Sequence, residues 1–190
     1  MAKWSKRKLR LDKGHRWKAK PGYKIFVANW GDVRFDFPAD WVVIPGDDSI
    51  KLHDRQPPDD DCVLQVSVMH LPRGIDWSSL PLAQLLEEVT KDDSRGPMSW
   101  GEIQYEKRPD FELAWLEARW VDPSEQRDAC SRACLARGSN VQPLITMDFW
   151  LDDMERFLPV WDEVLRSLRV GDYVKDPRLG EAHRLDRRHN

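Results

Sequence analysis

The dominant pattern of this 190-residue chain is the alternation of apolar and polar residues with a period of two. It is clearest at 62–71, where every second residue from Cys62 to Val68 is apolar. This period is typical of strands that bury one face, because successive side chains of a strand point to opposite sides of the sheet. We predict further strands, separated by short turns and loops, at 24–28, 33–37, 41–44, 50–54, 102–107, 111–121 and 141–150. We expect these strands to pair into one continuous layer.

Two segments have helical spacing instead. The first, 78–92, has Ser78 or Ser79 as its expected cap, and its apolar face is formed by Leu82, Leu85, Leu86 and Val89. The second, 152–169, carries a wider apolar stripe that is interrupted by Pro159, which predicts a kink or a restart. We expect both helices to seal the apolar side of one continuous sheet, which is an α+β fold.

Two regions leave alternatives open. Within 111–121 the apolar phase shifts near Trp115, and either a β-bulge or burial on both faces of the strand explains the shift. Residues 123–137 are either helix or strand: their start resembles a capped helix, but Gly138–Asn140 lies where the turn of a hairpin would fall. We favour a short helical turn at 123–128 followed by that hairpin.

Charge divides the chain into three parts. Residues 1–20 hold nine Lys or Arg and one acid, a net charge of +8, whereas 21–170 carry −12 and 171–190 carry +1. We therefore predict a basic N-terminal arm at 1–22, a single α+β domain at 23–170 and a polar C-terminal tail at 171–190. The arm is expected to be solvated or docked on the acidic body.

Composition also excludes several classes of protein. The sequence has no apolar run long enough for a membrane span and no apolar stretch of the kind found in signal peptides. Three cysteines are too few, and an odd number, for a disulfide framework. We expect a cytoplasmic location.

A short motif and the order of elements suggest a family. The segment Val33-Arg34-Phe35-Asp36-Phe37-Pro38-Ala39-Asp40-Trp41 resembles the opening of PsbP-like domains, in which a phenylalanine, a proline and a tryptophan recur at this spacing. That superfamily includes PsbP subunits of photosystem II, the Mog family of Ran-binding factors and bacterial relatives. The resemblance covers about residues 23–170 and implies an antiparallel sheet with helices on both sides. It also implies a domain that binds proteins rather than performing chemistry, although no family binding residue carries over.

Motifs of catalysis and phosphate binding are missing from the sequence. It contains no G-x-S-x-G, G-x-x-x-x-G-K-[ST], G-x-G-x-x-G or H-E-x-x-H, so we expect no enzymatic activity and no cofactor. The densest polar cluster consists of His53, Asp54 and the loop 59–61, which is the place for an alternative enzyme or metal site. Because three consecutive aspartates cannot aim every carboxylate at one point, a solvated turn is the favoured interpretation.

The cysteines are interpreted as core residues. Symmetry of the hairpin about 139–140 places Cys134 opposite Ile145 and Cys130 opposite Phe149, on the apolar face. Their C-x₃-C spacing lacks a second ligand pair for zinc. A Cys62–His53 dyad is disfavoured, because a symmetric loop pairs Cys62 with Asp54 and sends the two side chains to opposite faces.

Ten tryptophans are the most informative excess in the composition. Four are in apolar phase and are predicted core residues: Trp115, Trp120, Trp150 and Trp161. Others fall at turns or element edges, where tryptophan is a common interface anchor, so the interaction candidates are Trp30, Trp77 and Trp100. In the arm the candidates are Lys6, Arg7, Lys8, Arg10 and Trp17.

These observations lead to three expectations about function. The first is a protein-binding module, an adaptor or chaperone, that binds a partner or itself as a homodimer. The second is a nucleic-acid or anionic-surface binder that acts through the arm. We expect no membrane binding, because the arm lacks a recurring apolar face. The third is the enzyme or metal site at His53, Asp54 and Asp59–Asp61.

Overall fold

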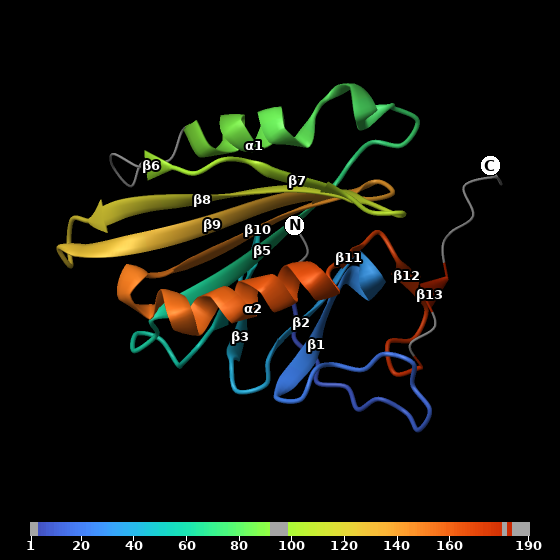
Figure 1. The fold of residues 1–190 in the computed structure, drawn as a ribbon. Coiled ribbons are helices and arrows are strands. Elements are labelled where there is room, and N and C mark those ends of the chain that lie inside the picture. The colour runs from blue at the N-terminus through green and yellow to red at the C-terminus, as the bar shows by residue number, and fades with distance from the viewer. Residues whose placement is uncertain (1–3, 92–98, 180–181, 184–190) are drawn as a thin grey trace.

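A computed structural model describes residues 4–91, 99–179 and 182–183 of the chain. Its centre is an eight-stranded antiparallel sheet (Figure 1). Seven strands follow one another across it, in the order β3 (Val42–Pro45), β4 (Ile50–His53), β5 (Cys62–His70), β10 (Val141–Trp150), β9 (Arg127–Arg137), β8 (Glu112–Asp122) and β6 (Ser99–Trp100). The eighth, β7 (Gln104–Lys107), pairs with β8 beside β6.

A second, smaller sheet lies apart from the first. It is three-stranded, in the order β1 (Tyr23–Ala28), β2 (Val33–Pro38) and β11 (Arg169–Val170). A short ladder of β12 (Tyr173–Val174) and β13 (Ala182–His183) follows near the C-terminus. The described residues also include three 3₁₀ turns: η1 (Asn29–Gly31), η2 (Trp77–Ser79) and η3 (Leu151–Asp153).

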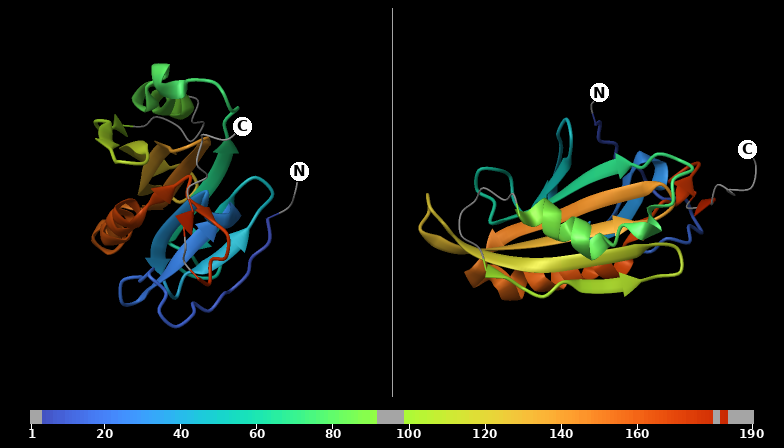
Figure 2. Two further views of the ribbon diagram at one scale, coloured as in Figure 1. Left: turned by 90° about the vertical axis from the view of Figure 1, so that its right-hand side faces the viewer. Right: turned by 90° about the horizontal axis from the view of Figure 1, so that it is seen from above.

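The two helices lie on opposite faces of the main sheet, as Figures 1 and 2 show. Helix α1 (Leu82–Lys91) packs on β8 and β9, whereas α2 (Met154–Ser167) packs on β2 and β10 from the other side. Antiparallel pairing with helices on both sides confirms the α+β architecture. The expectation that both helices seal one side of a single continuous sheet was wrong. Strands β8 and β9 have buried residues on both faces, and β1 and β2 form a separate sheet that packs against α2 through β2.

Two apolar clusters match this layering. The larger lies between the main sheet, α2 and the small sheet, and its fully buried side chains include Phe35, Leu64, Ile145 and Trp161. The smaller lies under α1 and consists of Leu82, Leu86, Ala114, Leu116 and Leu135. The predicted face of α1 is therefore correct at Leu82 and Leu86, but Val89 is 51% exposed because it lies on the outer side of the helix.

The structure resolves the phase shift near Trp115. The β8–β9 register is unbroken from Glu112↔Arg137 to Asp122↔Arg127, so there is no bulge. Leu113 belongs to the larger cluster and Leu116 to the smaller one, which is the predicted alternative of burial on both faces.

The region 123–137 is a turn followed by a strand. Asp122 Oδ1 accepts the backbone N–H groups of Ser124 (2.8 Å) and Glu125 (2.9 Å), which stabilises a tight turn into β9. This capping explains why the sequence resembles a helix start, although the predicted helical turn at 123–128 is absent. Helix α2 continues through Pro159 as one helix, without the predicted restart.

Candidate functional site

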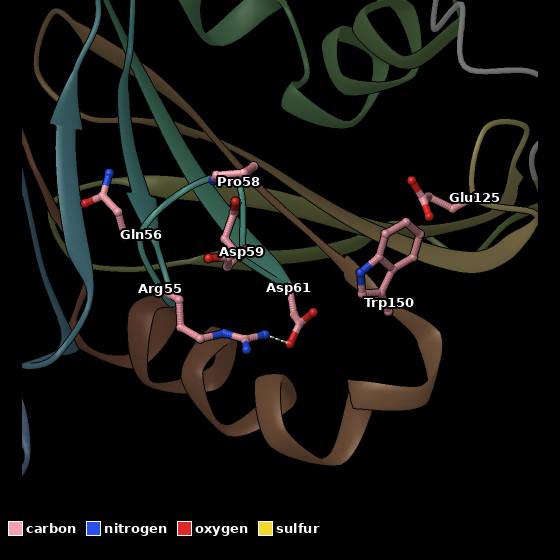
Figure 3. Close-up of a pocket in the computed structure, with 8 residues that line it drawn as sticks. Arg55, Gln56, Pro58, Asp59, Asp61, Glu125 and Trp150 are labelled. Carbon is pink, nitrogen blue, oxygen red and sulfur yellow. Dashed lines mark hydrogen bonds and ion pairs between the residues drawn. The ribbon is translucent and has the colours of Figure 1, made fainter.

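The polar loop between β4 and β5 forms one wall of an open pocket of about 730 Å³ (Figure 3). The opposite wall comes from the β8–β9 turn and the end of β10, which are distant in sequence. The lining residues are Arg55, Gln56, Pro58, Asp59, Asp60, Asp61, Glu125 and Trp150. Sequence reasoning identified the aspartates but missed Glu125 and Trp150, because only the sheet brings them to this loop.

Asp54 holds the loop together from beneath the pocket. Its side chain is fully buried, and Oδ1 accepts the backbone N–H groups of Asp61 and Cys62, both at 2.9 Å. Its Oδ2 accepts a bond from Arg156 Nη2 at 2.9 Å, and Arg55 Nε lies 3.5 Å away. Every carboxylate oxygen of Asp54 is therefore used to close the loop.

Three further members of the polar cluster, His53, Asp60 and Asp61, are also paired. His53 Nδ1 lies 2.8 Å from Asp60 Oδ2, and the Arg55 guanidinium donates to Asp61. Within the described ranges there is no group of three or more His, Cys, Asp or Glu side chains that could hold a metal ion. The cluster thus has the construction of a braced loop.

The predicted Cys62–His53 separation is confirmed. His53 pairs with Val63, and the Asp54 N–H donates to the Cys62 carbonyl, as the symmetric loop requires. Cys62 lies in the larger core cluster, and His53 points to the other face of the sheet. Burial raises the pKa of the Cys62 thiol well above its usual value, which opposes formation of a nucleophilic thiolate.

The other two thiols are core groups, as expected. Cys134 pairs with Ile145 and Cys130 with Phe149, in the predicted register, and both cysteines are fully buried. Burial raises the pKa of each to about 12. All three cysteines are free.

The tryptophans divide into core and surface groups. Among those predicted to build the core, Trp161 and Trp120 are buried, whereas Trp115 and Trp150 are half-buried. Among the interaction candidates, Trp30 is 59% exposed and Trp100 is 43% exposed. Trp77 is half-buried, and its indole N–H donates to the Pro72 carbonyl at 3.3 Å.

Trp30 stands out for its backbone as well as its exposure. It lies in η1 with φ +58°, and the preceding Asn29 has φ +44°, so a bulky aromatic residue occupies the left-handed region that disfavours it. The next residue, Gly31, approaches the chain before β12 so closely that an added Cβ would lie 2.1 Å from the Asp172 carbonyl oxygen. This contact places η1 against β12, whose Tyr173 is 41% exposed. The Val174 side chain faces Gly31, so Tyr173 points away from η1. We call the exposed surface of Trp30 and the rest of η1 the aromatic patch.

Trp100 lies on a different surface, at the β6–β7 edge of the main sheet. It pairs with Ala118, and Tyr105 of β7 pairs with Ala114, so both aromatic side chains point to the α1 side of the sheet. Tyr105 is 55% exposed and donates its hydroxyl to Glu112 Oε2 at 2.8 Å. Tyr105 was missed from the sequence, which carries no signal that β7 lies at an edge.

The described part of the basic arm is docked on the domain. Lys6 Nζ donates to the Val43 carbonyl at 2.9 Å, and the Arg34 guanidinium lies over the Trp17 ring at 4.3 Å. Trp17 is therefore half-buried, while Arg7, Lys8 and Arg10 are exposed. Within the described ranges no helix is long and apolar enough to span a membrane.

Comparison with solved structures defines the class of fold. The chain is similar to cyanobacterial PsbP (CyanoP) from Synechocystis sp. PCC 6803, with a TM-score of 0.60 and 14% identity over 84% of this chain and 97% of that one. It is also similar to the Ran-binding protein Mog1p of Saccharomyces cerevisiae, with a TM-score of 0.51 and 9% identity over 78% of this chain and 95% of that one. The fold is thus that of the PsbP/Mog-like proteins, as the opening motif indicated.

The sequence comparisons define a narrower group. Residues 24–174 match the model of the Alr1449 family. The chain is also 48% identical over 180 residues to the Nostoc sp. (strain PCC 7120) protein named "Uncharacterized protein alr1449", covering 94% of this chain and 93% of that protein. This chain belongs to the Alr1449 family.

Proposed function

We propose that this protein is a cytoplasmic, non-catalytic module that binds another protein through the aromatic patch. The observation that carries the proposal is Trp30, an exposed tryptophan in a left-handed backbone conformation. A conformation of this kind costs on the order of 1–3 kcal/mol, and such outliers cluster at functional sites. The free thiols support the cytoplasmic part of the proposal.

The position of the patch suits a docking anchor. Asp32 Oδ2 lies 2.7 Å from His70 Nε2, which ties the base of η1 to the end of β5, where Met69 is 59% exposed. The patch therefore sits on a braced support. Large aromatic side chains on a fixed support lose little conformational freedom on binding, which is why they recur at interface hot spots.

The polar cluster supports the non-catalytic part of the proposal. An acid–base or metal site needs groups with unused bonding capacity that converge on one point. Asp54, Asp60, Asp61 and His53 are instead engaged with each other or with arginines, as described above.

The test is a comparison of interacting proteins for matched variants. Trp30→Asn removes the aromatic ring and places a residue that tolerates positive φ, so we expect an unchanged or raised melting temperature. We expect the proteins that co-purify with the wild type from its native host to be lost with Trp30→Asn and retained with Val121→Asn. Val121 is 55% exposed, on β8.

Identical sets of co-purifying proteins for all three versions would refute the proposal. If light scattering showed that the wild type self-associates and that Trp30→Asn is monomeric, the partner of the aromatic patch would be a second copy of this chain rather than another protein.

A further inference from the structure

The docked arm is anchored on both sides of a short exposed segment. On one side, Trp4 packs against the larger core cluster and Lys6 bonds to Val43. On the other side, the Asp12 N–H donates to the Arg178 carbonyl at 3.1 Å, and His15 Nε2 lies 2.9 Å from the Pro177 carbonyl. The backbone between these anchors forms neither helix nor strand.

The anchored segment, 7–11, combines three cations with two leucines. Leu9 is 50% exposed and Leu11 is 39% exposed. Arg7, Lys8 and Arg10 are exposed as well, and no ion pair links them to any residue that the structure describes. We call residues 7–11 the basic loop. Leu179, which follows the Arg178 anchor in the chain, is 53% exposed.

The leucines separate two kinds of anionic partner. Nucleic-acid binding uses cations on phosphates and, for single strands, aromatic rings on bases. The tryptophan rings of the arm are already engaged within the protein: Trp17 lies beneath Arg34, and Trp4 packs against the larger core cluster. Exposed leucines add nothing to contacts with phosphates, but they partition into a bilayer interface, where a polybasic segment is also attracted to anionic lipid.

The exposed leucines also bear on the sequence-based expectation of no membrane binding. That expectation looked for the apolar face of a helix, whereas residues 7–11 form no helix. Leu9 and Leu11 are both exposed between the two anchors, so both are available to a lipid interface.

We propose that the basic loop docks this protein on an anionic lipid surface, with Leu9 and Leu11 inserted among the headgroups and Arg7, Lys8 and Arg10 bound to their phosphates. Stable attachment requires two signals, an apolar one and an electrostatic one, and the loop supplies both on a fixed scaffold. This inference uses a surface separate from the aromatic patch and does not depend on the proposed function.

The experiment is co-sedimentation of the full chain with vesicles of phosphatidylcholine alone or mixed with phosphatidylglycerol. We expect binding only to the anionic vesicles, weakened by salt. Leu9→Ser with Leu11→Ser, which leaves the charge unchanged, should lower partitioning about tenfold. Changing Arg7, Lys8 and Arg10 to Gln should lower it about a hundredfold. Val121→Ser, an equally exposed apolar position outside the arm, should change nothing, and melting temperatures show whether each variant is folded.

Two results would overturn the proposal. One is sedimentation with anionic vesicles that the leucine variant leaves intact, since this would mean simple charge attraction. The other is no vesicle binding together with salt-sensitive binding of double-stranded RNA or DNA, measured by fluorescence anisotropy, which would assign the loop to nucleic acid.

Discussion

Replacement of Asp54 tests whether the polar cluster is a structural brace. In Asp54→Ala the backbone N–H groups of Asp61 and Cys62 lose their common acceptor, and Cys62 is buried, so water does not replace it. An unsatisfied buried donor costs about 1–3 kcal/mol, and the ion pair with Arg156 is lost as well. Because Arg156 is half exposed, that pair adds little. We expect Asp54→Ala to lower the free energy of unfolding by about 2–3 kcal/mol.

Asp54→Asn is the matched control, because its amide oxygen keeps the acceptor for both N–H groups and only the charge is lost. We expect a loss of about 1 kcal/mol. Urea unfolding followed by tryptophan fluorescence measures both variants against the wild type. If Asp54→Ala and Asp54→Asn agreed within about 0.5 kcal/mol, acceptance of the two N–H bonds would not be what holds this loop.

Three further predictions concern the core and its ionisable groups. The thiols of Cys62, Cys130 and Cys134 should resist Ellman's reagent at mildly alkaline pH until the protein unfolds, because burial raises the pKa of all three. Rapid labelling of any of these thiols in the folded protein would contradict this. In urea unfolding, Leu86→Ala should lower the free energy of unfolding by about 2–4 kcal/mol and Val89→Ala by less than about 0.5 kcal/mol, because only Leu86 is fully buried. Equal losses for the two variants would contradict the packing of α1 on the sheet through Leu86. Burial, and then Glu163, raise the pKa of Asp36, so the unfolded chain ionises first and wild-type stability falls as pH rises through the folded-state pKa. Asp36→Asn should therefore gain stability relative to the wild type as the pH rises over that window, and parallel stability–pH curves would show that folding does not raise the pKa of Asp36.

Hairpin geometry was predictable from the sequence wherever a short polar link separated two alternating segments. The pairing of Cys134 with Ile145 and of His53 with Val63 follows from counting outward from a turn, and the structure confirms both registers. Counting works because a one-residue slip would turn every apolar side chain of the strand to the wrong face.

The residue pattern at the start of 123–137 led to a wrong prediction of a helical turn. Asp122 with Pro123 has the composition of a helix start, yet Asp122 caps a tight turn between two long strands. The same carboxylate satisfies free N–H groups in either structure, so the residue type does not choose between them. Pairing of β8 with β9 over eleven residues on each strand makes the choice.

The sequence alone indicated the longer strands, the two amphipathic helices, the core cysteines and the charge division, because each is a property of neighbours along the chain. It did not indicate the two-residue strands β6, β11, β12 and β13. The tertiary structure decided which faces the helices cover, that Trp150 and Glu125 join the β4–β5 loop, and that the arm is docked with Leu9 and Leu11 exposed. These features arise from contacts between residues far apart in sequence. Alternation specifies which side of a strand is buried, but only packing specifies against what.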